Sequence, residues 1–96
     1  MKKNILKSEI HLQRLDTWLW RSRFFRTRTS SSHFIKSQSI RLNSYPVKKP
    51  AYLVKENDIL TFFTNKKIVV IKIKKLPTER SPAKAAYTLY DEILEK

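Results

Sequence analysis

The chain contains no glycine in 96 residues, and this absence limits the turns that it can make. Left-handed backbone positions in tight turns normally go to glycine, because it has no Cβ to clash with the backbone. Asparagine tolerates this conformation better than most other residues. We therefore expect Asn43 and Asn65, which lie between short apolar segments, to fill such positions. The alternative is ordinary type I turns, which need no positive φ.

The length and the cysteine count narrow the class of protein. A chain of 96 residues has room for one domain with a modest core, and too little for a deep catalytic cleft as well. The lack of cysteine excludes disulfides and thiolate metal sites and favours the reducing cytoplasm. The longest apolar runs, residues 59–63 and 68–71, are far below the roughly 20 residues that span a bilayer. We expect a cytoplasmic protein with neither a signal peptide nor a membrane span.

Positive charge is concentrated in the first half of the chain. Lysine and arginine number 21 against 8 acidic residues, which gives a net charge of +13. Residues 1–50 hold 12 basic and 2 acidic side chains, whereas residues 51–96 hold 9 and 6. Six of the seven arginines precede residue 42, and the planar guanidinium suits bidentate contacts with phosphate. A polyanionic partner is expected, and nucleic acid is favoured over a membrane surface.

The first half of the chain predicts a tail followed by two helices. Residues 1–13 mix lysine, asparagine, serine and histidine with few aliphatic residues, which is typical of a loosely held tail. From residue 15 apolar residues recur at helical spacing, which predicts a helix over residues 15–24. Asp16 would lie in its first turn, where the helix dipole favours a carboxylate. Thr29 is expected to cap a second helix that ends near residue 37.

The rest of the chain predicts strands and a final helix. Short strands are expected at Ile40–Leu42 and Tyr45–Val47, and longer ones at residues 59–63 and 67–74. Ser81-Pro82 is typical of a helix start, with serine as the cap and proline in the first helical position. A helical apolar face would continue through Ala86, Leu89, Tyr90 and Ile93. The domain would then comprise residues 14–78, with 79–96 as a helical extension packed on it.

Arginines and aromatic residues alternate over residues 14–28. Arg14, Arg21 and Arg28 are seven residues apart, which on one helix would place them near the same side. Arg23 and Arg26 add charge, and basic residues beside aromatic ones suit a surface that follows an RNA backbone and stacks unpaired bases. Trp18 is expected in the core, whereas Trp20 is equally suited to packing or to stacking on RNA.

Catalysis finds little support in the sequence. His11 lies in the tail and His33 would lie on the second helix near bound phosphate; neither has an identifiable catalytic partner, and both are interpreted as surface residues. Asp16, a single carboxylate among arginines, is interpreted as an organiser that forms an ion pair with Arg23 or with a more distant residue such as Arg41. We predict no catalytic residues, no cofactor and no metal site, since the composition lacks glycine loops and metal-ligand spacings.

Two blocks of residues form recognisable motifs. The first comprises Arg14-Leu15-Asp16, Trp18-Leu19-Trp20, Arg23-Phe24-Phe25-Arg26-Thr27-Arg28, Ile35, Ile40-Arg41-Leu42-Asn43 and Val47-Lys48. The second comprises Glu79-Arg80-Ser81-Pro82-Ala83, Ala86 and Leu89-Tyr90-Asp91-Glu92. The first block resembles the S-four domain, an RNA-binding module, and the second is similar to the C-terminal part of the ribosome-associated heat shock protein fifteen family. The chain departs from the family's usual glycines at Ser37-Gln38 and at Ser44, and from its usual Leu-Ala-Arg at residues 30–32.

The resemblance implies an α+β fold, an α-helix pair packed on a small twisted antiparallel sheet, with an appended C-terminal helix. It also implies binding to ribosomal RNA in large ribosomal subunits that carry a stalled nascent chain on transfer RNA, and a role in recycling them. Asn43 would organise the turn after the first strand. The expected RNA-binding residues, with Arg21 added from its spacing, are Arg14, Arg21, Arg23, Arg26, Arg28, Lys36, Arg41 and Lys48.

Several alternatives stay open from the sequence. The same module occurs as an accessory domain of RNA-modifying or aminoacylating enzymes, although this chain is too short for a catalytic domain. A general binder of structured RNA or of DNA would carry the same charge pattern. A basic membrane-surface or nucleoid protein is less favoured, because the basic helix has only part of the wide apolar face that membranes require. We expect a monomer, with transfer RNA as a further partner.

Overall fold

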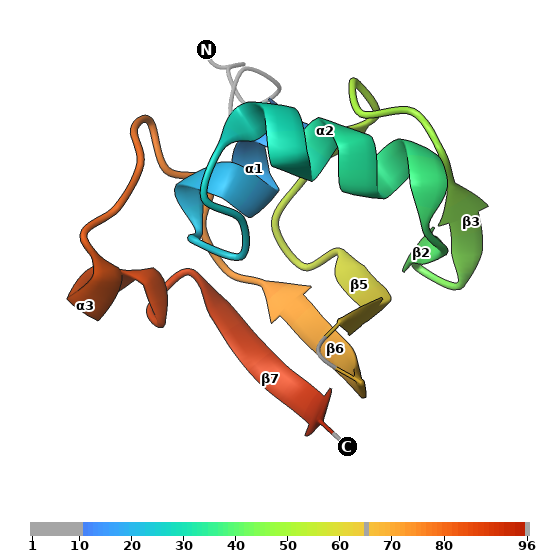
Figure 1. Cartoon of the computed structure of the whole chain (residues 1–96). Coiled ribbons are helices and arrows are strands. Elements are labelled where there is room, and N and C mark those ends of the chain that lie inside the picture. The colour runs from blue at the N-terminus through green and yellow to red at the C-terminus, as the bar shows by residue number, and fades with distance from the viewer. Residues whose placement is uncertain (1–10, 65, 96) are drawn as a thin grey trace, which may run out of the picture.

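The computed structural model describes residues 11–64 and 66–95, and its framework is one antiparallel sheet (Figure 1). The strand order is β3-β2-β5-β6-β7, and a separate two-stranded ribbon pairs β1 with β4. The strands are β1 (Gln13–Arg14), β2 (Ile40–Leu42), β3 (Tyr45–Val47), β4 (Leu53–Val54), β5 (Ile59–Thr64), β6 (Lys67–Ile73) and β7 (Tyr90–Glu95). The helices are α1 (Leu15–Arg21), α2 (Arg28–Ser37) and α3 (Ala83–Ala86). The predicted α+β class is confirmed.

The hydrophobic core lies between the helix pair and one face of the sheet, as the positions of α1 and α2 in Figure 1 indicate. Trp18 is fully buried there, as predicted, and its Nε1 donates to the carbonyl oxygen of Lys75 over 2.9 Å. Trp20 packs under the guanidinium of Arg80, which lies 5.8 Å from the centre of its ring. Of the two roles predicted for Trp20, packing and stacking on RNA, the structure shows packing. The helices also contribute Leu15, Leu19 and Ile35, and the strands Ile40, Leu42, Val47, Leu60, Phe62, Val69, Ile71 and Ile73.

The two helices meet at a turn that differs from the predicted one. α1 ends at Arg21, three residues early, because Arg23 adopts a left-handed φ of 68° and the hydroxyl of Ser22 donates to the carbonyl oxygen of Trp18. Thr29 does not cap α2, so that prediction is wrong. Thr27 is the cap: its Oγ1 accepts from the backbone N–H of Ser30, and the Ser30 hydroxyl accepts from that of Thr27. This reciprocal capping box satisfies two backbone donors at once, which Thr29 could not do.

Left-handed backbone positions are filled without glycine. Asn43 has a φ of 51°, as predicted, and Ser44 follows with 76°, which gives the β2–β3 hairpin a turn with both central residues left-handed. The Asn43 side chain donates to Asp58 Oδ1 over 3.0 Å and accepts from the N–H of Ile59 over 2.8 Å, so it fastens the turn to the start of β5. Asn65 lies outside the described residues, and its neighbour Lys66 has a φ of 61°.

The C-terminal segment is mostly a strand, which corrects the predicted helical face through Ile93. α3 has only four residues, and its cap is Pro82 rather than Ser81. The Thr88 hydroxyl donates to the carbonyl oxygen of Ala85, and β7 then pairs antiparallel with β6. Pairing gives β6 hydrogen-bond partners on its second side, which outweighs a helical spacing of only a few residues.

The start of the chain also differs in detail from the predicted tail. β1 begins at Gln13, which pairs with Val54, and residues 1–10 lie outside the described part of the chain. No helix within residues 11–64 and 66–95 is long and apolar enough to cross a membrane.

Candidate RNA-binding surface

The first turn of α1 holds a buried carboxylate under an arginine. Asp16 is 3% exposed, and the Arg14 guanidinium donates to it twice, Nε to Oδ1 over 3.0 Å and a terminal nitrogen to Oδ2 over 2.9 Å. The predicted partners Arg23 and Arg41 are wrong for this ion pair, because the extended backbone of Arg14 turns its side chain back over the helix start. The hydrogen bond and the charge of Asp16 raise the pKa of Arg14. The pair therefore fixes a half-exposed guanidinium beside α2.

The exposed side of α2 forms a shallow pocket with Asp16. Its volume is about 450 Å³. Arg28 and Lys36 lie at its two ends, and the hydroxyl groups of Thr29 and Ser32 lie between them with His33. The lining residues, which we call the α2 groove, are Asp16, Arg28, Thr29, Ser32, His33 and Lys36. Residues four apart on a helix share a face, so Arg28, Ser32 and Lys36 form one row.

Two of the predicted arginines face the C-terminal segment instead. Arg21 donates to the carbonyl oxygen of Pro77 over 2.7 Å, and Arg23 donates to that of Ser81 over 2.6 Å. Arg80 reciprocates with hydrogen bonds to the carbonyl oxygens of Trp20 and Phe25. Arg21, Arg23 and Arg80, which we call the arginine clasp, thus tie the end of α1 to residues 77–81. The seven-residue spacing does not bring Arg14, Arg21 and Arg28 together, because the turn separates Arg21 from Arg28.

The remaining predicted residues lie at three places. Arg26 is exposed in the turn between the helices. Arg41 is exposed on β2 between buried Ile40 and Leu42. Because side chains alternate along a strand, Arg41 lies on the sheet face opposite the helices. Its guanidinium donates to the carbonyl oxygen of Ser44. Lys48 is exposed two residues before Pro50, whose carbonyl oxygen accepts from the N–H of Asp16. This contact brings the segment that follows Lys48 against the start of α1, whereas Arg41 faces away from the helices.

A comparison with known proteins places the fold and these residues in a family. The family model of the S4 domain, the S-four domain of the sequence resemblance, matches residues 13–60, from β1 into β5. The chain belongs to the S4 domain family.

This S4 domain protein is also similar to proteins named heat shock protein 15. Heat shock protein 15 of Escherichia coli, in strains K12 and O157:H7, is 33% identical over 82 residues, which are 85% of this chain and 61% of the relative. A solved structure described as the trimeric structure of Vibrio cholerae heat shock protein 15 has a TM-score of 0.79 at 29% identity, and the match covers 85% of this chain and 82% of that one. The predicted resemblance to the heat shock protein fifteen type is confirmed. The chain spans 61% of the length of these curated relatives.

Some residues of the S4 domain protein's groove were not predicted. His33 is exposed on the second helix, as predicted, and it lines the groove four positions after Thr29. The sequence predicts Thr29 only as a helix cap, and Ser32 only as part of a departure from the family pattern. The helical spacing from Arg28 to Lys36 could have indicated all three, because it places them between two cations on one face. Within the described residues, no three His, Asp or Glu side chains gather as metal ligands would.

Proposed function

We propose that this S4 domain protein binds RNA through the α2 groove, with Arg14 and Lys48 beside it. The observation that carries the proposal is the row of Arg28, Ser32 and Lys36 on the exposed face of α2. The two cations are about 12 Å apart along the helix, which suits contacts with separate phosphates of one backbone. The hydroxyl groups between them can donate to phosphate oxygens or to a 2′-hydroxyl. Arg26, Arg41, and the parts of Arg21 and Arg23 not used by the arginine clasp are proposed as outlying contacts.

The proposed target is ribosomal RNA in large ribosomal subunits that carry a stalled nascent chain on transfer RNA. Similarity to heat shock protein 15 supports this choice, together with the cationic groove. The protein would aid recycling of these subunits in the cytoplasm by binding rather than by catalysis. Transfer RNA is proposed as a second contact. We also propose that residues 14–78 form the binding unit and that residues 79–96 belong to the same domain.

A sucrose-gradient titration with purified large subunits tests this proposal. The full chain is mixed with subunits that carry peptidyl-transfer RNA or with empty subunits, and the bound fraction is measured. We expect tighter binding to the loaded subunits. Lys36→Ala should weaken binding several-fold, whereas the matched variant Lys84→Ala, which removes an exposed lysine from α3, should not. Equal losses in both variants would point to net charge alone and contradict the groove.

A general nucleic-acid binder is the second candidate. Phosphate contacts carry no sequence information by themselves, and the groove offers mostly such contacts. Competition with DNA and RNA of equal length and secondary structure separates the two candidates, because only RNA presents 2′-hydroxyl groups to Thr29 and Ser32. Equal competition by DNA would favour the general binder.

A further inference from the structure

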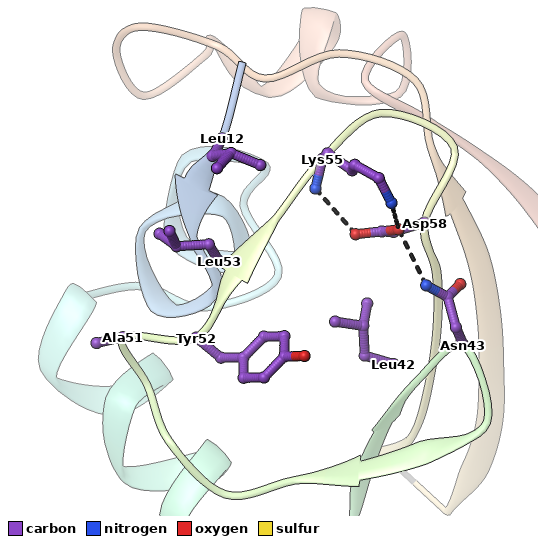
Figure 2. Close-up of a pocket in the computed structure, with 8 residues that line it drawn as sticks. All are labelled: Leu12, Leu42, Asn43, Ala51, Tyr52, Leu53, Lys55 and Asp58. Carbon is purple, nitrogen blue, oxygen red and sulfur yellow. Dashed lines mark hydrogen bonds and ion pairs between the residues drawn. The ribbon is translucent and has the colours of Figure 1, made fainter. Parts of the chain in front are cut away.

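A second pocket is lined by Leu12, which precedes β1, by residues in and around β4, and by residues of the β2–β3 turn. Figure 2 shows it between β4 and the β2–β3 turn, and its volume is about 550 Å³. One wall is apolar: Tyr52 extends its ring toward Leu42, and Leu12 and Leu53 lie beside each other. Leu12, Tyr52 and Leu53 are 52%, 48% and 49% exposed. About half of each apolar surface therefore faces water.

The opposite wall is polar and held in fixed positions. Asp58 is 4% exposed, and its Oδ1 accepts from the Asn43 side chain over 3.0 Å and from Lys55 Nζ over 2.9 Å. Its Oδ2 accepts only the backbone N–H of Lys55 in these contacts, over 2.9 Å. The ammonium of Lys55 and the amide of Asn43 each have further protons to donate. The wall thus presents donors and an acceptor in the same pocket as a half-exposed aromatic ring.

Backbone hydrogen bonds connect this pocket to the proposed RNA-binding surface. The N–H of Leu15 donates to the carbonyl oxygen of Tyr52 over 2.8 Å, and the N–H of Asp16 donates to that of Pro50 over 3.1 Å. Arg14 pairs with Leu53 in the β1–β4 ribbon. An RNA strand that contacts Arg14 therefore passes within reach of the pocket.

We propose that this pocket binds one unpaired nucleobase of the RNA that the α2 groove holds. A base is flat, stacks on an aromatic ring and carries donors and acceptors along its edge, which matches the ring of Tyr52 on one wall and the Asn43–Lys55–Asp58 cluster on the other. A peptide side chain could also enter, but Lys55 in the pocket wall and Arg14, which pairs with Leu53, favour a ligand joined to phosphates. The inference rests on the proposed function, and it adds readout of a single base to binding of the backbone.

Binding of the full chain to a set of hairpin RNAs tests the pocket. Each hairpin carries a single-nucleotide bulge at the same place. Four of the hairpins hold one of the four bases there, and the fifth holds an abasic residue. We expect the preferred base to bind about 5- to 150-fold tighter than the abasic bulge, the range for one stacked base. Tyr52→Ala should reduce binding of the bulged RNA to the abasic level, and Tyr52→Phe should preserve it. Tyr87→Ala, the matched control, removes a ring that is 74% exposed beside α3 and should change neither.

Two further results distinguish failure of the pocket proposal from failure of the proposed function. A 4-thiouridine at the bulge should photocross-link the wild-type protein within residues 51–55, a result that does not depend on any variant. If base and abasic bulges bind equally while Arg28→Ala weakens both, the pocket proposal is overturned and RNA binding by the groove stands. A pocket that binds a peptide side chain instead of a base would give this same result. If no RNA binds in a salt-dependent manner, the proposed function fails and the pocket proposal fails with it.

Discussion

At the scale of single residues, Asp16 controls how charge is presented at the α2 groove. Its buried carboxylate holds Arg14 by two hydrogen bonds and lines the groove with Arg28 and Lys36. Removing its charge with Asp16→Asn makes the protein more cationic, so net charge alone predicts tighter RNA binding. We expect weaker binding instead, because Arg14 loses its fixed orientation. We also expect a loss of stability of about 1 kcal/mol, since Arg14 is half exposed, which is roughly 4–8 °C in Tm.

Arg28→Ala is the control for this prediction. Its exposed side chain lies at the first position of α2, so its loss should weaken RNA binding while Tm stays within about a degree or two. Thermal melts and filter-binding titrations at one salt concentration measure both properties. Tighter RNA binding by Asp16→Asn at unchanged Tm would show that Asp16 is an ordinary surface residue.

Asp58 should make stability depend on pH. Burial alone raises its pKa, but the hydrogen bonds from Asn43 and Lys55 more than offset this and hold the pKa below its ordinary value. A lowered pKa stabilises the folded state above the unfolded pKa near 3.8, and the contribution disappears as pH falls through the folded value. We therefore expect the difference in Tm between wild type and Asp58→Asn to be full at pH 6 and to shrink below about pH 4. A constant difference down to pH 2.5 would contradict this linkage.

At the scale of elements, the β2–β3 hairpin carries a cost at Ser44. A non-glycine residue in left-handed backbone costs roughly 1–2 kcal/mol, and Ser44 has a φ of 76°. Ser44→Gly should therefore raise Tm by a few degrees, which corresponds to about 0.5–1 kcal/mol after the greater freedom of glycine in the unfolded chain is subtracted. Asn43→Gly, at the neighbouring position, should lower Tm because it loses the hydrogen bonds to Asp58 and Ile59. If Ser44→Gly and Asn43→Gly changed Tm equally, backbone strain would not distinguish Ser44 from Asn43.

The same hairpin illustrates what could be predicted from sequence. Asn43 between two short β-rich segments indicated both strands and a left-handed turn, since this information is local. At Gln38, where the family usually has a glycine, the backbone is extended with a φ of −117°. Glutamine at this position therefore causes no strain comparable with that at Ser44. The family motif predicted Arg14, Arg28, Lys36 and Lys48 as RNA-binding residues, and the structure places Arg28 and Lys36 in the α2 groove and Arg14 on its Asp16.

The elements that the sequence did not predict depend on distant contacts. The spacing of Ala86, Leu89, Tyr90 and Ile93 fits a helix, but β6 offers that segment a row of unpaired backbone groups, which no local pattern reveals. The roles of Arg21 and Arg23 likewise depend on carbonyl groups nearly 60 residues away along the chain. The pairing of Arg14 with Asp16 is local, yet it requires the extended backbone that precedes α1.

At the scale of the whole molecule, five of the seven arginines fall into two groups with different roles. The arginine clasp joins the end of α1 to the C-terminal segment, whereas Arg14 and Arg28 lie at the α2 groove. A net charge of +13 opposes self-association in the absence of RNA. We therefore propose a monomer, and light scattering should give about the mass of one chain, 11.5 kDa. Three times this mass would instead match the trimeric relative from Vibrio cholerae.

Salt dependence measures how many phosphates the whole surface neutralises. With about 6 to 8 contacts and roughly 0.7–0.9 released counterions for each, a plot of log K against log salt should have a slope near −4 to −7. Arg28→Ala should make the slope shallower by about 0.7–0.9, because it removes one phosphate contact. Lys84→Ala removes the same charge from α3 and should leave the slope unchanged. A wild-type slope shallower than about −2 would rule out binding dominated by phosphate contacts, and equal changes in the two variants would place those contacts outside the α2 groove.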